Sequence, residues 1–171
     1  MGALHNKMKA TSIIMTIASL ALAGIFPLAG FFSKDKILEV AFNADAIVLW
    51  TILWITAGLT AFYSFRLVMK IFFGTQNYSN EEFHPHEAKN FVIAAMIPLA
   101  VLAVIAGWFE HSFIEFVTKA LPTWEANNIK HSTTWILILA TSAIAIGGIL
   151  LAVFKYKKDG FSKSWEDTAN Y

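Results

Sequence analysis

Residues 24–36 read Gly24-Ile25-Phe26-Pro27-Leu28-Ala29-Gly30-Phe31-Phe32-Ser33-Lys34-Asp35-Lys36, at the end of a long apolar stretch. Two glycines and a proline interrupt that stretch, and Lys34 and Asp35 follow the interruption directly. A bilayer tolerates a broken helix only where protein or a polar cavity surrounds it. Ionisable side chains inside a membrane are expensive and usually functional. The segment therefore predicts movement of an ion or proton through a membrane.

The composition predicts an integral membrane protein. Of the 171 residues, 57% are hydrophobic and 15% are charged, whereas a soluble domain is about half apolar and about a quarter charged. The apolar residues form long runs, and a run of about 20 is enough to cross a bilayer. The net charge of +1 gives no indication of nucleic-acid binding. The chain has no cysteine, which excludes disulfides and cysteine-ligated metal centres within it.

The apolar pattern predicts an all-α transmembrane bundle of about four crossings within residues 1–154. The expected crossings cover residues 11–42, 46–73, 91–109 and 134–154. The first is expected to be discontinuous, because short apolar segments interrupted by Gly and Pro are typical of broken transporter helices. The breaking residues are Gly24, Pro27 and Gly30. A helical hairpin or a re-entrant loop is the alternative, which such short arms make the less favoured reading.

Two further features of the bundle follow from helical periodicity. Residues 110–121 predict a short amphipathic helix that lies along the membrane interface, because the apolar side chains fall on one helical face. In the last crossing, Ala143 and Gly147 have the small-xxx-small spacing that permits close helix packing.

The basic residues predict an orientation with both termini inside. Nine of the 13 Lys and Arg residues then lie on the cytoplasmic side, in agreement with the positive-inside rule. These nine are Lys7, Lys9, Arg66, Lys70, Lys89, Lys155, Lys157, Lys158 and Lys163, and the other four are Lys34, Lys36, Lys119 and Lys130. This orientation requires the broken segment to count as one crossing, and it makes residues 155–171 a polar cytoplasmic tail.

Lys34 is the predicted proton carrier. On a helix it shares a face with Ile37 and Leu38, so its amine projects from an apolar stripe. Burial favours the neutral amine, which lets a lysine take up and release a proton near neutral pH. Asp35 points to another face, where we expect it to pair with a neighbouring helix or to bias the field around Lys34. Alternatively, Lys34 and Lys36 extend to the far interface and Asp35 is solvated beside them.

Two other groups of polar residues are secondary candidates. Arg66 and Lys70 share a helical face and are expected to anchor the cytoplasmic end, with a role inside the bundle as the alternative. The run His84-Pro85-His86-Glu87 contains metal-ligand residue types, but its proline prevents a regular helix and no further ligand set lies nearby. We therefore expect a solvated turn there and no metal. A nucleotide fingerprint is absent from the sequence, so we expect no redox or cofactor site within this chain.

The chain resembles the C-terminal part of the L-type antiporter-like subunit of proton-pumping NADH–quinone oxidoreductase, respiratory complex I. The resemblance is carried by the runs Met1-Gly2-Ala3-Leu4, Lys7-Met8, Leu20-Ala21-Leu22-Ala23 with residues 24–36 and Ile37-Leu38, Leu59-Thr60-Ala61-Phe62-Tyr63-Ser64-Phe65-Arg66-Leu67, Phe72-Phe73-Gly74 and His84-Pro85-His86-Glu87. The long run around Lys34 is highly specific to this subunit type. The resemblance is close over about residues 1 to 110, and the rest fits mainly in arrangement.

The resemblance implies that Lys34 is the lysine of a discontinuous helix that exchanges protons with the outer aqueous phase, followed by Asp35 as in the family pattern. Phe26 stands where the family commonly has a second proline. The family's earlier helices and its long lateral helix are not in this sequence, so we expect the chain to be a fragment that could hardly pump alone.

The resemblance also implies partners and a location. NADH, FMN, iron–sulfur clusters and quinone would be bound by other subunits, and the neighbours would be other membrane subunits of the complex, including antiporter-like ones, in a bacterial inner membrane. Two alternatives remain. One is the related large subunit of a multisubunit Na⁺/H⁺ antiporter or of a ferredoxin- or F420-linked complex. The other is a helical scaffold with no transport role.

Overall fold

The computed structural model describes residues 2–74, 85–120 and 131–157, and every element within them is helical. In chain order the elements are η1 (Leu4–Asn6), α1 (Lys9–Ala23), α2 (Ala29–Asn43), α3 (Ile47–Val68), η2 (Met69–Phe73), α4 (Asn90–Ile105), η3 (Ala106–Phe109), α5 (Glu110–Ala120) and α6 (His131–Lys157). The predicted all-α class is confirmed. His84, Lys130 and residues 158–171 of the expected tail lie outside the described residues.

Three helical stretches are long and apolar enough to cross a membrane. They are Ile47–Phe73, Asn90–Val117 and Trp135–Tyr156, with 27, 28 and 22 residues. At about 1.5 Å per residue, each exceeds the roughly 30 Å of hydrocarbon in a bilayer. The helix α1 is apolar but shorter, with 15 residues, and α2 has the same length. Directly after α3, the element η2 is wound as a π-helix over Met69–Phe73.

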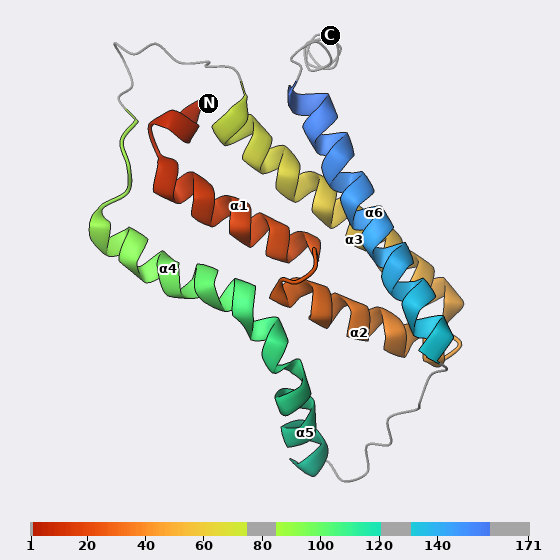
Figure 1. Cartoon of the computed structure of the whole chain (residues 1–171). Helices are drawn as coiled ribbons and strands as arrows, with labels where there is room; N and C mark the ends of the chain where they lie inside the picture. The colour runs from red at the N-terminus through yellow and green to blue at the C-terminus, as the bar shows by residue number, and fades with distance from the viewer. Residues whose placement is uncertain (1, 75–84, 121–130, 158–171) are drawn as a thin grey trace.

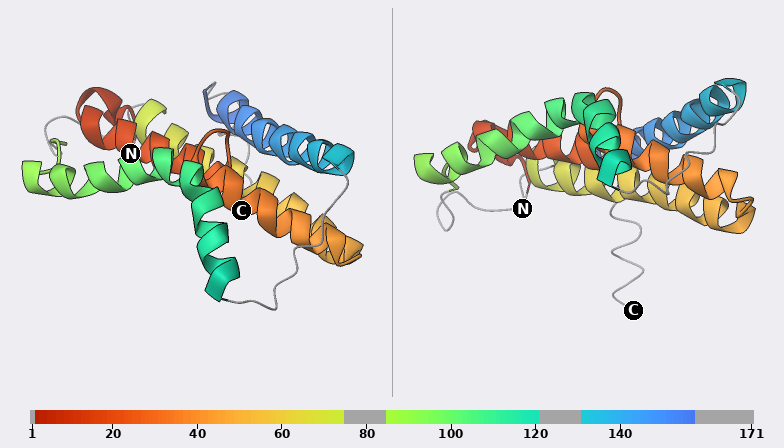
Figure 2. Two further views of the ribbon diagram at one scale, coloured as in Figure 1. Left: turned by 60° about the horizontal axis from the view of Figure 1, so that its bottom comes forward. Right: turned by 90° about the horizontal axis from the view of Figure 1, so that it is seen from below.

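Figure 1 shows how the helices are arranged. The helices α1 and α2 follow one another in nearly the same direction, separated by a short loop. The helix α3 packs against α1, α2 and α6, while α4 lies along the other side of α1. Beyond η3 the chain bends, so that α5 points away from the line of α4 in both views of Figure 2.

Small residues allow α3 and α6 to pack closely. Ala145 is buried, and a Cβ added to Gly148 would lie only 2.5 Å from the carbonyl oxygen of Gly58 on α3. The prediction that Ala143 and Gly147 form this contact is therefore wrong. Ala143 is exposed, and a Cβ on Gly147 would meet nothing within 4 Å. The contacting face of α6 is rotated by about one residue from the predicted face.

The outer surface of the bundle is apolar. The helix α4 has no buried residue, and large side chains such as Phe91, Leu99 and Val101 are exposed along it. Such a surface is unfavourable in water but is compatible with lipid tails, which are as apolar as the side chains themselves. The exposed apolar residues thus agree with a bundle that is immersed in a membrane.

Candidate functional site

The loop between α1 and α2 begins with a regular helix stop. Gly24 adopts φ +80°, and its N–H donates to the carbonyl of Ala21 at 3.0 Å. The N–H of Ile25 donates to the carbonyl of Leu20 at 3.3 Å, which completes a Schellman motif. Because the left-handed conformation is strained for residues with a Cβ, glycine is the residue that fits here. The motif satisfies two of the last carbonyls of α1 and leaves the carbonyl of Ala23 open to another donor.

Gly30 lets α2 begin directly against the end of α1. A Cβ added to Gly30 would lie 1.8 Å from the carbonyl oxygen of Ala21, which is far inside van der Waals contact. The backbones of the two helices therefore touch at this point. Pro27 lies between the two helices, after a cis Phe26–Pro27 peptide bond. Gly24, Pro27 and Gly30 thus all lie in or directly beside the loop that joins α1 and α2.

Lys34 turns back from α2 to this junction. Its Nζ donates to the carbonyl oxygen of Ala23 at 3.4 Å, and a Cβ on Gly24 would lie 3.0 Å from its Cδ. The side chain is half-buried. The C-terminal end of a helix carries a partial negative charge, which favours a cation at this position. The break therefore provides an acceptor and a favourable field for a protonated lysine.

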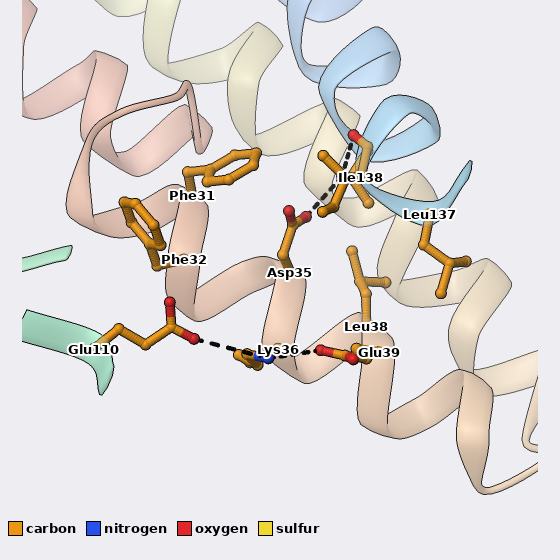
Figure 3. Close-up of a pocket in the computed structure, with 10 residues that line it drawn as sticks. Phe31, Phe32, Asp35, Lys36, Leu38, Glu39, Glu110, Leu137 and Ile138 are labelled. Atoms are coloured by element: carbon orange, nitrogen blue, oxygen red, sulfur yellow. Dashed lines mark hydrogen bonds and ion pairs between the residues drawn. The ribbon is translucent and has the colours of Figure 1, made fainter. Parts of the chain in front are cut away.

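Asp35 points to a different helix. Its Oδ1 accepts a hydrogen bond from the Thr141 hydroxyl of α6 at 2.7 Å, and its Oδ2 is buried with no hydrogen-bond partner. Residues Asp35 and Thr141 both line a pocket of about 220 Å³ between α2, α6 and the start of α5. The pocket, shown in Figure 3, is large enough for several water molecules.

Three charged side chains share this pocket with Asp35. Lys36 lies 3.0 Å from Glu39 and 3.9 Å from Glu110, with each distance measured from its Nζ to a carboxylate oxygen. Figure 3 shows Lys36 between these two carboxylates. The nearer oxygen of Glu110 has no hydrogen bond, so the contact at 3.9 Å is a loose ion pair. The pocket therefore combines three carboxylates with one lysine, an arrangement that can bind water and exchange protons.

Arg66 and Lys70 lie away from this pocket. Both place their charge over the ring of Tyr156, at 5.6 Å and 5.5 Å from its centroid. Tyr156 is 15 residues along α6 from Thr141, which corresponds to about 22 Å of helix. The structure therefore does not bring these two basic residues into the pocket that Asp35 lines.

Glu87 has a structural contact that the sequence does not predict. Its carboxylate accepts hydrogen bonds from the N–H of Ala10 at 2.8 Å, the N–H of Thr11 at 3.3 Å and the hydroxyl of Thr11 at 2.5 Å. The first turn of α1 is thus capped by a residue that precedes α4. The Thr11 hydroxyl, together with the backbone N–H groups, holds the pKa of Glu87 below its ordinary value. Among the described residues, no three His, Cys, Asp or Glu side chains are placed so that they could hold a metal ion together.

Glu110, Glu39 and Thr141 are the pocket residues that the sequence reading missed. Glu110 follows the apolar run of α4, and an acid at the end of a predicted crossing is a usable signal. Thr141 has no comparable signal, because a threonine in an apolar helix ordinarily bonds its own backbone.

This geometry defines a class of protein: a helical membrane protein with ionisable groups placed at the junction of two short helices. Residues 1–60 match a family described as "NADH:quinone oxidoreductase/Mrp antiporter, TM". Subunit L of the NADH-quinone oxidoreductase of Campylobacter jejuni is 47% identical over 167 residues, which cover 98% of this chain and 26% of that protein.

More distant relatives give the same result. The chloroplastic NAD(P)H-quinone oxidoreductase subunit 5 of Chlorokybus atmophyticus is 34% identical over 92% of this chain and 25% of its own length. Subunit L of Mycobacterium tuberculosis is 36% identical over 75% of this chain and 23% of its own length. The chain belongs to this antiporter-like family and is similar to the C-terminal part of subunit L. It spans about a quarter of the length of these relatives.

The matches also locate the protein. Bacterial subunit L relatives and three apolar helices that are long enough to span a bilayer identify an integral protein of the bacterial inner membrane.

Proposed function

We propose that this chain is a segment of a membrane subunit of NADH-quinone oxidoreductase that contributes to proton translocation. Electron transfer from NADH to quinone would occur in other subunits, which would bind NADH, FMN, iron–sulfur clusters and quinone. The partners would be the other membrane subunits, including neighbouring antiporter-like ones. The names of the relatives support this assignment, and the placement of Lys34 at the junction of α1 and α2 is the observation that carries it.

The proposal treats α1 and α2 as one discontinuous crossing. Each helix has 15 residues, or about 22 Å, which is too short for the roughly 30 Å of hydrocarbon. Together they are long enough, and Figure 1 shows them running in nearly the same direction. Counting them as one gives four crossings, together with α3, the continuous stretch of α4 and η3, and α6. The start of α1 then lies at the same end as the C-terminus of α6, as the distribution of basic residues requires.

Lys34 is the proposed proton carrier of this segment. As an ammonium it donates to the carbonyl of Ala23 at the negative end of α1. Loss of that proton leaves a neutral amine, which a half-buried site in a membrane accommodates more easily than a charge. Asp35 faces the pocket from a different side of α2 and would exchange protons with water there.

Co-purification tests the class of complex. We expect an affinity-tagged chain, extracted in mild detergent, to carry NADH oxidation and quinone reduction with it. Transport without NADH oxidation in the purified material would favour the Na⁺/H⁺ antiporter alternative. Replacing Lys34 with alanine separates these two transport functions from a helical scaffold. If the chain is a scaffold, the variant should assemble and leave proton translocation unchanged.

A further inference from the structure

The hydroxyl of Thr141 has one hydrogen and two acceptors within reach. Its Oγ1 lies 2.7 Å from Oδ1 of Asp35 and 3.0 Å from the carbonyl oxygen of Ile138 on its own helix. Thr141 is 7% exposed, so water has little access to this hydroxyl. A single hydrogen can make only one strong bond at a time. The side chain must therefore choose between the carboxylate of Asp35 and the backbone.

That choice depends on the charge of Asp35. When Asp35 is a carboxylate, the hydroxyl of Thr141 donates to it, and a hydrogen bond to an ionised acceptor is the stronger of the two. When Asp35 carries a proton, its own O–H can donate to Oγ1 of Thr141. The hydroxyl hydrogen of Thr141 then turns to the carbonyl of Ile138. Both states of Asp35 are thus hydrogen-bonded without any movement of the helices.

The pocket supplies the other half of the exchange. Oδ2 of Asp35 is buried without a hydrogen-bond partner. Asp35 and Thr141 both line the pocket. The charged groups that face Asp35 are Lys36 and Glu39 from α2 and Glu110 from α5. Lys36 is held by the two glutamates, at 3.0 Å and 3.9 Å, and the hydrogen bond to Asp35 comes from Thr141 of α6.

We propose that Thr141 is a positioning residue, which holds Asp35 toward the pocket and allows it to alternate between carboxylate and carboxylic acid. In the release step, the O–H bond of Asp35 breaks and the proton passes to water in the pocket. The hydroxyl hydrogen of Thr141 turns from the carbonyl of Ile138 back to Oδ1 of Asp35. Thr141 keeps its own hydrogen throughout. This inference rests on the proposed function, since it describes how one residue of that proton path is positioned.

The test compares Thr141→Val, which removes only the hydroxyl, with Thr141→Ser, which keeps it. The matched control is Thr56→Val, because Thr56 is exposed and its hydroxyl bonds the carbonyl of Ile52 on its own helix at 2.7 Å. The intact complex is reconstituted in liposomes. The protonation of Asp35 is followed by the infrared band of its acid form, assigned by its loss in Asp35→Asn. Proton translocation is recorded over the same pH range.

We expect Thr141→Val to raise the pH at which Asp35 is half-protonated by about one unit or more, the effect of losing one hydrogen bond to a charged group. Thr141→Ser and Thr56→Val should retain the wild-type midpoint. An unchanged midpoint in Thr141→Val, or an equal shift in Thr141→Ser, would overturn the proposal. If Thr141→Val does not assemble, Thr141→Ala makes the same deletion with less volume and carries the same expectation.

The two readouts separate this inference from the proposed function. A shifted infrared midpoint together with a shifted pH profile of translocation supports both. A shifted infrared midpoint with an unchanged profile supports the role of Thr141 in positioning Asp35 and overturns a place for Asp35 in the proton path. An unchanged infrared midpoint overturns the inference whatever the translocation measurement shows.

Discussion

Replacing Gly30 with alanine should force α1 and α2 apart at their junction. The new Cβ would lie 1.8 Å from the carbonyl oxygen of Ala21, about 1.6 Å inside the 3.4 Å at which ordinary contact begins. Because the obstacle is a helix backbone, it cannot rotate away, and we take the upper end of the overpacking cost, about 3 kcal/mol. Alanine returns about 1 kcal/mol through its higher helix propensity. The expected net loss of stability is therefore about 2 kcal/mol.

For a chain of 171 residues, that loss corresponds to a fall of about 4–8 °C in the unfolding midpoint. The assay heats the detergent-solubilised complex in steps and follows retention of the subunit on native gels. Gly147→Ala is the matched control, because the same methyl group would meet nothing within 4 Å on α6. We expect this control to be neutral or slightly stabilising.

A Gly30→Ala protein with the midpoint of wild type would refute the reasoning. It would mean that α2 does not begin against the last carbonyls of α1, and that Lys34 is not held at a tight junction. A midpoint lowered equally in Gly147→Ala would show that the assay reports any added methyl group rather than this contact.

Two further outcomes follow from the hydrogen bonds. Glu87→Gln should loosen the start of α1, seen as weaker protection of the Ala10 and Thr11 amides from hydrogen exchange, with each rate compared with its intrinsic rate at the same pH. Because the folded pKa of Glu87 is lowered, its contribution is complete above the ordinary carboxyl range and is lost as the pH falls through the folded value. The protection in wild type should therefore fall in acid, and that of the variant should not. Trp54→Phe removes the hydrogen bond from Nε1 of Trp54 to the carbonyl of Ala140 at 3.0 Å. The loss should lower the stability of the α3–α6 pair by about 0.5–1 kcal/mol, measured in the same heating assay. An unchanged unfolding midpoint would contradict that contact.

The junction between α1 and α2 could be predicted because its signals are local. Gly24 and Gly30 have required conformations or contacts within a few residues, and Lys34 reaches only 11 residues back to Ala23. Composition and run length were likewise sufficient to predict an all-α membrane bundle. The contacts at the junction join residues that lie at most 11 positions apart in the chain.

The pocket could not be predicted because it depends on packing between distant segments. Asp35 and Thr141 are 106 residues apart, and Glu110 comes from a third helix. The wrong face of α6 has a related cause. That helix is apolar on all sides, so its sequence carries no periodic signal for the face that meets α3. The sequence alone does not show which of Gly147 and Gly148 faces α3. The close approach of Gly148 to Gly58 on α3 is what distinguishes the two glycines.

The most direct test of the central claim is proton translocation by a Lys34→Ala variant in inverted membrane vesicles, recorded together with NADH oxidation. Lys119→Ala is the control, because Lys119 is exposed and, among the described residues, pairs with Glu115 on its own helix at 2.8 Å. If Lys34 carries protons, the Lys34→Ala complex will assemble but translocate fewer protons than wild type and the control. Translocation equal to that of wild type, in a fully assembled complex, would contradict the account.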